Sequence, residues 1–329
     1  MDKEIFEKYL RSVDLDNELF GEEEAFRKTD LVLQKGYYHT NVASPFFTKF
    51  SKSRDFQSAQ RLHNSLVLNG FRYWSSKEEQ LRLDGIKKGI PPIMVVTLPK
   101  SGSVYIQNNL SNTLGVPHIQ ISLARFPNDY ILSESLKIFA MGGAVSQTHL
   151  DPSTENLAIL HNTGIRRIHV HVRDPRQATV SWAKYLANEV IGKLSHQRHL
   201  ADPPLPKGFD DLPENIKYEW FATNHYPSCI RWIAQWLAVS QTDDRFSITF
   251  TDHSEFEKSN SGLIKIILEN FSNNMHFDLH KIQQPEVGKS HFRRGLNDEW
   301  RDCFTPALQK WMNSLIPQDQ CAKFQWPMA

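Results

Sequence analysis

A short loop places a lysine, a glycine and hydroxyl side chains where an apolar run gives way to a helical pattern. The loop reads Thr97-Leu98-Pro99-Lys100-Ser101-Gly102-Ser103. Free backbone N–H groups and the positive end of a helix dipole converge at such a junction, which makes it suited to bind a phosphate or sulfate group. Lys100 precedes Gly102, and Gly102 is the only glycine, so the GxxxxGK order of ordinary P-loop kinases and GTPases is absent. The loop predicts an anion site of another kind.

Two further segments carry groups that bind phosphate. Arg173 and Ser181 stand eight residues apart, where a predicted strand ends and a helix begins. The guanidinium offers a planar donor fork and the serine a hydroxyl, a pair suited to a terminal phosphate. Instead of binding phosphate, Arg173 could form an ion pair with Asp174 or simply stand at the start of the helix. Near the C-terminus, Arg293, Arg294 and Gly295 supply two more cations and a glycine.

One histidine lies where it can act on a bound substrate. His149 follows Thr148 at the end of a predicted strand, 24 residues before Arg173. An imidazole titrates near neutrality and can take a proton from an attacking hydroxyl or amine. The alternative is a histidine that is merely hydrogen-bonded at a strand end.

These segments are positioned by alternating strands and helices. Short runs rich in β-branched residues precede helical patterns four times, with strands at 93–97, 144–148, 168–172 and 246–250 and helices at 104–114, 155–161, 177–190 and 262–271. This alternation predicts an α/β fold, a parallel sheet flanked by helices and joined by right-handed crossovers. Residues 297–316 are predicted as a final helix with Trp300 and Trp311 buried.

The motifs resemble those of sulfotransferases that use 3′-phosphoadenosine 5′-phosphosulfate (PAPS). The order from Pro99 to Ser103 is similar to the 5′-phosphosulfate loop of that family, and the segment from Arg173 to Ser181 is similar to its 3′-phosphate motif. Phe292-Arg293-Arg294-Gly295 looks like its third cofactor segment. The resemblance covers about residues 93–305 and implies a three-layer, P-loop-like sulfotransferase fold.

The resemblance also implies a role for each residue. His149 is the catalytic base, Lys100 stabilises the leaving phosphate, and Ser181 engages that lysine and restrains premature hydrolysis of the donor. No metal is required, and the product is adenosine 3′,5′-bisphosphate (PAP). The residues implied to bind the nucleotide are Lys100, Ser101, Gly102, Ser103, Val104, Tyr105, Arg173, Ser181, Arg293, Arg294 and Gly295.

Several positions depart from the family pattern. Val104 replaces a hydroxyl residue, Tyr105 stands where tryptophan usually stacks on adenine, and Gln147 makes the acceptor side less cationic. In the dimer motif KxxxTVxxxE, proline replaces valine at Pro306 and lysine replaces glutamate at Lys310. We therefore infer no dimer, and the oligomeric state stays open.

Composition bounds the remaining possibilities. Thirty-eight basic and 37 acidic residues leave a net charge of +1, so no global basic field favours nucleic acid. The three cysteines form no disulfide framework or zinc motif, and no apolar run is long enough for a membrane span. We expect a cytoplasmic enzyme with a small-molecule acceptor. It is similar to bacterial sulfotransferases that tailor natural products, including cyanobacterial alkaloids, by fold-level analogy.

We expect a helical N-terminal extension over residues 1–90 and a sulfotransferase domain over 91–329. Within the domain, the Pro-rich insertion at 192–220 is expected to cover the acceptor. His169 and His171 share a strand face, which leaves core histidines or a metal site open. Trp220, Trp232 and Trp236 are interpreted as core residues. A P-loop-type phosphotransferase and a catalytically inactive nucleotide-binding protein are the alternative functions.

Overall fold

The computed structural model describes residues 76–122, 126–127, 129, 131, 133–186, 208–271, 275–284 and 298–327. The chain divides into two compact units, residues 1–79 with 153–159 and residues 80–152 with 160–329. The sheet lies in the second unit. Residues 1–75 of the predicted extension and residues 192–207 of the predicted insertion lie outside the described residues, as do residues 187–191 before the insertion.

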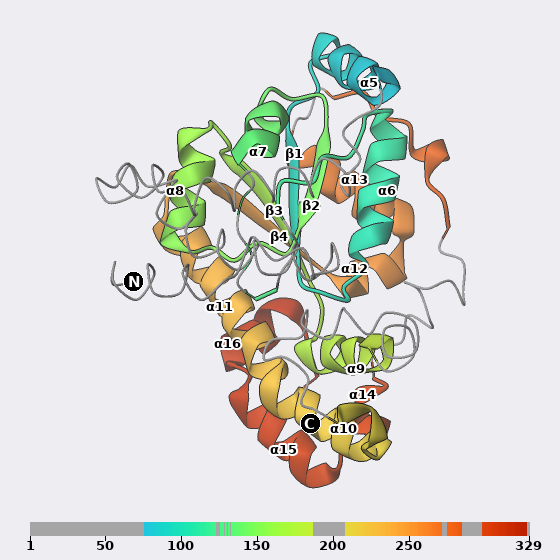
Figure 1. Ribbon diagram of the computed structural model, residues 1–329, viewed down its shortest axis with the longest axis vertical. Coiled ribbons are helices and arrows are strands. Elements are labelled where there is room, and N and C mark those ends of the chain that lie inside the picture. The colour runs from blue at the N-terminus through green and yellow to red at the C-terminus, as the bar shows by residue number, and fades with distance from the viewer. Residues whose placement is uncertain are drawn as a thin grey trace, which may run out of the picture. The chain divides into compact units, whose positions relative to one another are not determined.

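A parallel sheet forms the centre of the second unit (Figure 1). It has the strand order β2-β1-β3-β4, with strands β1 (Ile93–Thr97), β2 (Val145–Thr148), β3 (Arg167–Val172) and β4 (Ser247–Asp252). All five residues of β1 are buried, as expected for a strand covered on both faces. The parallel sheet confirms the predicted α/β class, and the predicted strand bounds are correct to within two residues.

Helices lie between these strands and continue the chain before β1 and after β4. They are α5 (Ser76–Lys87), α6 (Ser103–Leu114), α7 (Ser133–Ala140), α8 (Thr154–Asn162), α9 (Pro175–Tyr185), α10 (Glu214–Asn224), α11 (Tyr226–Thr242), α12 (His253–Lys258), α13 (Asn260–Glu269), α14 (Trp300–Cys303), α15 (Pro306–Leu315) and α16 (Gln318–Phe324), with 3-10 turns η3 (Phe209–Asp211) and η4 (Leu279–Lys281). Within the described part of the chain, no helix is both long enough and apolar enough to span a membrane.

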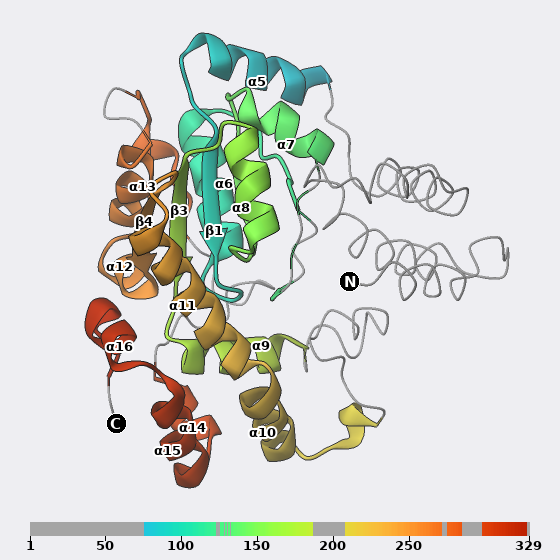
Figure 2. The same ribbon diagram turned by 90° about the vertical axis from the view of Figure 1, so that its left-hand side faces the viewer.

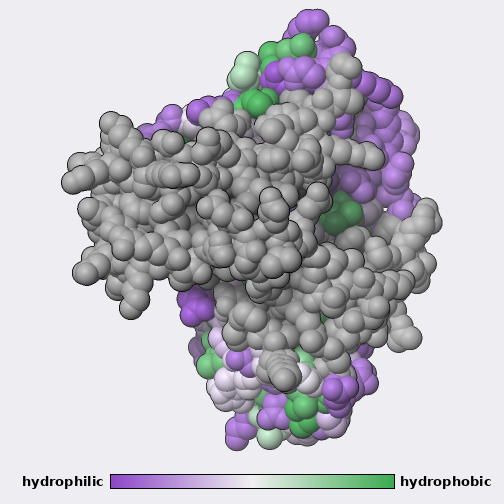
Figure 3. Space-filling view, in the orientation of Figure 1, coloured by the Kyte–Doolittle hydropathy of each residue, from purple (hydrophilic) through white to green (hydrophobic). Residues whose placement is uncertain are grey.

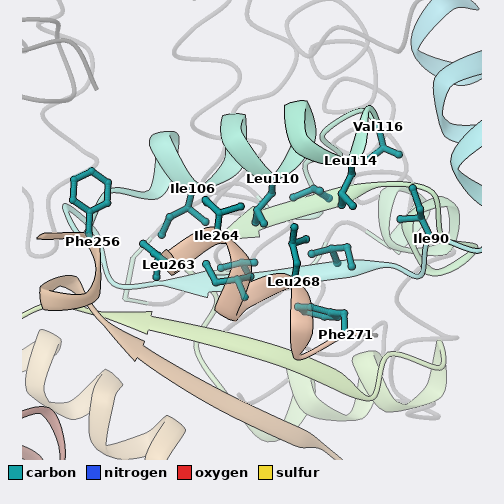
Figure 4. Packing of buried hydrophobic residues seen from close by; sticks show 14 residues of the cluster. Ile90, Ile106, Leu110, Leu114, Val116, Phe256, Leu263, Ile264, Leu268 and Phe271 are labelled. Atoms are coloured by element: carbon teal, nitrogen blue, oxygen red, sulfur yellow. The ribbon is translucent and has the colours of Figure 1, made fainter. Parts of the chain in front are cut away.

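Helices cover both faces of the sheet. In Figures 1 and 2, α6 and α13 lie on one face, and α7 and α11 lie on the other. Apolar side chains of α6 recur at helical spacing, at Ile106, Leu110 and Leu114, and pack toward β1 (Figure 4). The same cluster takes in the apolar face of α13. This packing fixes the direction of α6 and therefore the place where its N-terminus meets the end of β1.

The C-terminal segment differs from the single helix predicted over 297–316. Thr305 caps a new helix, because its side chain accepts a hydrogen bond from the Leu308 N–H and Pro306 occupies the first turn of α15. Trp300 is buried as predicted, but Trp311 is 38% exposed, so the prediction that it is buried is wrong. Figure 3 shows hydrophobic surface at the lower end of this face, in the region of α10 and α15.

The predicted insertion loop also ends earlier than expected. Residues 214–220 form the first part of α10 rather than a loop. Pro213 precedes a regular helical pattern in which Tyr218, Phe221 and Ala222 are buried, and this spacing favours a packed helix over an exposed connection. The prediction of a loop through residue 220 is therefore wrong for its last seven residues.

A buried ion pair joins the start of α9 to the C-terminal helices. Arg176, which is fully buried, donates from Nε to Asp174 Oδ1 at 2.9 Å and from Nη2 to Asp174 Oδ2 at 2.6 Å. Its remaining donors reach Asn313 Oδ1 at 2.7 Å and the Pro327 carbonyl at 2.9 Å. Every terminal nitrogen of this guanidinium is thus hydrogen-bonded, which is what makes a buried charge tolerable.

We predict that Arg176→Met lowers the free energy of unfolding by about 3–5 kcal/mol, because it leaves the Asp174 carboxylate buried without its cation. Urea unfolding followed by circular dichroism measures the loss. Arg245→Met is the matched control, since Arg245 binds Asp243 with the same two-residue spacing but on the surface. The control should leave the unfolding midpoint nearly unchanged. Equal effects of the two substitutions would contradict the role assigned to burial.

Candidate active site

The loop between β1 and α6 is bent so that backbone N–H groups are exposed at the helix start. Lys100 and Gly102 have positive φ angles of 64° and 96°. Gly102 is the N-cap of α6, no side chain of the described residues caps this end by a hydrogen bond, and the first turn holds no acidic residue. The helix dipole and its free N–H groups therefore make this end attractive to an anion, as the sequence predicts.

Lys100 lies against a residue that the sequence analysis missed. Its Nζ is 4.0 Å from the centre of the Tyr185 ring, at the end of α9. Ser181 is one turn earlier on the same helix and is partly buried. The Tyr185 ring thus holds the ammonium group near α9, the helix that carries Ser181. A cation–π pair between residues so far apart in the chain leaves no local sequence signal.

His149 is fixed to the end of β1. Its Nδ1 lies 2.7 Å from the Thr97 carbonyl oxygen. A carbonyl only accepts hydrogen bonds, so Nδ1 carries the proton and Nε2 of the neutral ring is left as the acceptor. Gln147, two residues earlier in the β2 segment, donates to the Thr97 hydroxyl at 2.9 Å and so contacts the same strand end. This tautomer is the one that a general base requires.

The environment of His149 keeps its ring neutral. Burial, with a smaller contribution from the positive charge of Lys100, lowers the pKa of His149 to about 4, although the hydrogen bond to Thr97 acts in the opposite direction. A histidine ordinarily titrates near neutrality, which is what the sequence alone predicts for His149. The difference arises because a charged imidazole loses hydration in this part-buried position. At pH 7 the ring is therefore unprotonated.

The chain on both sides of His149 is held by buried polar groups. The Thr148 hydroxyl donates to Asp129 Oδ2 at 3.1 Å. Trp232 and Trp236 on α11 both donate their indole N–H to the Leu150 carbonyl, at 3.0 and 3.1 Å. Both indoles are buried, in agreement with the interpretation that they belong to the core. The residues before and after the imidazole are thus fixed independently of any ligand.

Arg173 is hydrogen-bonded to the same loop. It is 6% exposed, and its Nη1 donates to the Lys100 carbonyl at 2.9 Å. From the sequence, Asp174 was a possible ion-pair partner of Arg173. In the structure, Asp174 pairs with Arg176 instead. Arg173 therefore both braces the loop and brings a positive charge beside it.

Three predicted nucleotide contacts lie in the first turn of α6. Ser103 is partly buried and Val104 is 37% exposed. Tyr105 packs edge-on against Phe256, with ring centres 4.7 Å apart, and among the described residues nothing partners its buried hydroxyl. A stacking role for Tyr105 stays a prediction. Arg293, Arg294 and Gly295 lie outside the described residues.

The strand order explains why these groups meet. β1 lies between β2 and β3, so the chain leaves β1 toward one side of the sheet and then crosses to the other. In open parallel sheets, ligands bind outside the carboxyl ends of the strands at such a reversal. The carboxyl ends of β1, β2 and β3 carry Lys100, His149 and Arg173, respectively. The arrangement suits anion binding combined with proton removal.

Solved structures of low identity are similar to this chain, among them the following two. Mouse sulfotransferase SULT7A1 in complex with PAP is 15% identical, with a TM-score of 0.46, over 74% of this chain and 89% of that chain. Retinol dehydratase in a complex with retinol and PAP is 13% identical, with a TM-score of 0.38, over 78% of this chain and 98% of that chain. Both structures contain PAP. No family model and no curated protein matches the chain.

His169 and His171 are core residues. Both are fully buried, and both hydrogen-bond to the Thr251 hydroxyl, at 2.8 Å each. His169 Nδ1 also lies 2.9 Å from the Thr249 hydroxyl and 3.0 Å from Asn270 Nδ2. Across the described residues, no group of three or more potential ligand side chains is placed to hold a metal ion. Burial lowers the pKa of His169 to about 3 and that of His171 to about 4.

We predict that the protein loses stability as the pH falls from 6.5 toward 4. In this range the imidazole of His169 is protonated in the unfolded chain but stays neutral in the folded protein, because burial lowers its pKa. Acid therefore favours the unfolded state. Each such histidine contributes a slope of about 1.4 kcal/mol per pH unit. His169→Gln should reduce the slope of unfolding free energy against pH by about that amount, measured by urea unfolding.

His276→Gln provides the control, because the His276 side chain is exposed and its ring is in water before and after unfolding. An unchanged slope in the His169 variant would show that this ring is protonated in the folded protein.

Proposed function

We propose that this protein is a PAPS-dependent sulfotransferase that transfers a sulfuryl group to a hydroxyl or amine of a small molecule. The observation that carries the proposal is the convergence at the end of β1. His149 and Arg173 come from the two neighbouring strands, and each hydrogen-bonds to a backbone carbonyl of the segment that contains Lys100. The family resemblance assigns the base to His149, the leaving group to Lys100 and the 3′-phosphate to Arg173. Hydrogen bonds to one segment of backbone thereby link these three residues.

The chemistry of this unit fits the proposed donor. The open N-terminus of α6 and the Lys100 ammonium suit the 5′-phosphosulfate, and Arg173 with Ser181 suits the 3′-phosphate. The positive charges of Lys100 and Arg173 offset part of the negative charge that such a nucleotide carries. Gly102 and Ser103 are proposed to surround the 5′ group at the start of α6, and Ser101, whose N–H and hydroxyl donate to the Leu98 carbonyl, is proposed to shape the loop.

In the proposed reaction, Nε2 of His149 accepts the proton of the acceptor hydroxyl or amine. The acceptor oxygen or nitrogen forms a bond to sulfur as the bond between sulfur and the bridging phosphate oxygen breaks. The electron pair of that bond leaves with PAP, and Lys100 stabilises the negative charge that develops there. The neutral, Nδ1-protonated ring of His149 meets the requirement for the first step.

The acceptor is proposed to be a small molecule, with the natural-product class as the narrower proposal. Residues 1–90 and 192–220 are proposed to contact it, and of these, residues 1–75 and 192–207 lie outside the described residues. On the acceptor side, the neutral Gln147 stands where the family resemblance implies a basic residue, and it donates to the Thr97 hydroxyl. This favours a neutral over an anionic acceptor.

We predict that His149→Ala and Lys100→Ala each lower kcat by about two or more orders of magnitude, because each removes a group that acts in the transition state. The measurement is transfer from radiolabelled PAPS to a panel of alcohols, phenols, steroids and amines. His276→Ala, at an exposed histidine, is the control and should retain full activity.

The same assay separates the alternative functions. Transfer of phosphate from a nucleoside triphosphate, with no use of PAPS, would identify a phosphotransferase. Tight PAP binding without turnover on any acceptor would identify a nucleotide-binding protein. Turnover of the His149 variant within tenfold of the wild type, at saturating substrates, would exclude this residue as the base.

We predict a level pH profile of kcat/KM between pH 6 and 8, with an acid limb near pH 4. The base must be unprotonated, and burial lowers the pKa of His149 to about 4, so the rate rises with pH through that value and is constant above it. Circular dichroism at each pH separates this limb from acid unfolding. An acid limb near 6.5 in folded protein would be inconsistent with a buried neutral base.

A further inference from the structure

Two histidines outside the predicted site meet at one carbonyl of the loop. The Ser101 carbonyl oxygen lies 3.0 Å from His171 Nε2 and 3.2 Å from His253 Nδ1. His171 lies on β3, and His253 is the first residue after β4. Ser101 is fully buried, and both histidines are almost completely buried. Neither imidazole belongs to the motifs from which the site was predicted.

The hydrogen bonds define where the protons are. A carbonyl oxygen accepts only, so His171 Nε2 and His253 Nδ1 both carry a proton. His171 Nδ1 must then accept from the Thr251 hydroxyl, which in turn accepts from His169 Nε2. His169 Nδ1 accepts from Asn270 or Thr249. The donors thus point in one direction, from Asn270 at the end of α13 to the Ser101 carbonyl.

The orientation of the Ser101 carbonyl sets the orientation of an N–H group. A trans peptide unit is planar, and its C=O and N–H point in opposite directions. With the carbonyl held by His171 and His253, the Gly102 N–H points away from these rings. The preceding carbonyl, of Lys100, is held by Arg173. The Ser101 N–H and hydroxyl both donate to the Leu98 carbonyl.

This peptide has a reason to need a restraint. Glycine tolerates either hand of backbone conformation, so the Ser101–Gly102 peptide can turn over at little steric cost. A turned peptide would direct the Ser101 carbonyl, instead of the Gly102 N–H, toward an anion at the start of α6. Two imidazole donors on that carbonyl favour one orientation only.

We propose that His171 and His253 are positioning residues that hold the Ser101–Gly102 peptide with its N–H toward the 5′-phosphate or sulfate group of the nucleotide. The inference rests on the proposed function for the identity of that ligand. It assigns a role in anion binding to two residues that touch the loop from behind and not the ligand.

The packing of His253 fits a fixed ring. The imidazole stacks on Phe256 with ring centres 5.3 Å apart and an angle of 8° between the planes. Its Nε2 is buried and has no hydrogen-bond partner among the described residues, so its Nδ1 bond to Ser101 is the polar contact that orients it. A Cβ atom on Gly102 would lie 4.0 Å from His253 Cε1, which places the ring directly behind this glycine.

The first experiment compares two nucleotides by calorimetry. For His253→Leu we expect PAP binding about tenfold weaker and adenosine 3′-phosphate binding changed less than twofold, because only PAP carries a 5′-phosphate at the loop. His171→Leu should behave in the same way. Thermal unfolding in the absence of ligand verifies that each variant is folded. Equal losses for both nucleotides, or no loss of PAP binding, would overturn the proposal.

A second pair of variants separates the hydrogen bond from general packing. Asparagine places its amide N–H near the position of imidazole Nδ1, whereas glutamine places it near Nε2. His253→Asn should therefore retain PAP affinity within threefold, and His253→Gln should lose about tenfold. This pair decides the question if the leucine variants do not fold. Equal affinities in the two amide variants would show that the Nδ1 bond has no part in binding.

The ligands also distinguish this inference from the proposed function. If the wild-type protein binds inorganic phosphate but not PAP, the proposed function fails, and the same variants are compared for phosphate binding. A tenfold loss of phosphate binding in His253→Gln but not in His253→Asn would still support the positioning role. If the wild-type protein binds neither PAP nor phosphate, both proposals are wrong.

Discussion

The position of β1 between β2 and β3 is the constraint on which the rest of the molecule depends. β1 is buried on both faces. The polar segment that follows its carboxyl end therefore takes its hydrogen-bond partners from the carboxyl ends of the neighbouring strands. These partners come from the neighbouring strands, and they bind successive backbone groups. His149 binds the Thr97 carbonyl, Arg173 that of Lys100, and His171 that of Ser101. The chemically capable side chains are thereby ordered along a single loop.

Burial determines the charge state of the groups around this loop. A charged side chain out of water is stable only when it is paired, and otherwise the neutral form prevails. Arg176 meets the first condition through Asp174, and the His169 and His171 rings meet the second, with lowered pKa values. The polar interior thus contributes little net charge behind the loop. Lys100, in the loop, and Arg173, bound to the loop backbone, supply positive charge at the loop itself.

Local patterns in the sequence predicted the strands, the loop and the motifs within it. Gly102 and Lys100 are recognisable because the junction of strand and helix needs special backbone angles and leaves N–H groups free. Contacts between distant segments gave no such signal. Tyr185 under Lys100 and His253 behind Ser101 depend on how α9 and β4 pack against the loop, which spacing along the chain does not encode. The Thr305 cap likewise divided a helix that apolar periodicity alone had predicted as continuous.

The Asp174–Arg176 pair has a consequence for synthesis of the chain on the ribosome. The Pro327 carbonyl that completes the hydrogen bonding of Arg176 follows it by 151 residues, and Asn313 follows it by 137. The guanidinium and carboxylate therefore emerge long before the groups that allow them to be buried. Until then the start of α9, next to Arg173, must stay hydrated. All four strands of the sheet are translated before the last helices, so the sheet can assemble first, and the Asp174–Arg176 pair is buried only after those helices have been translated.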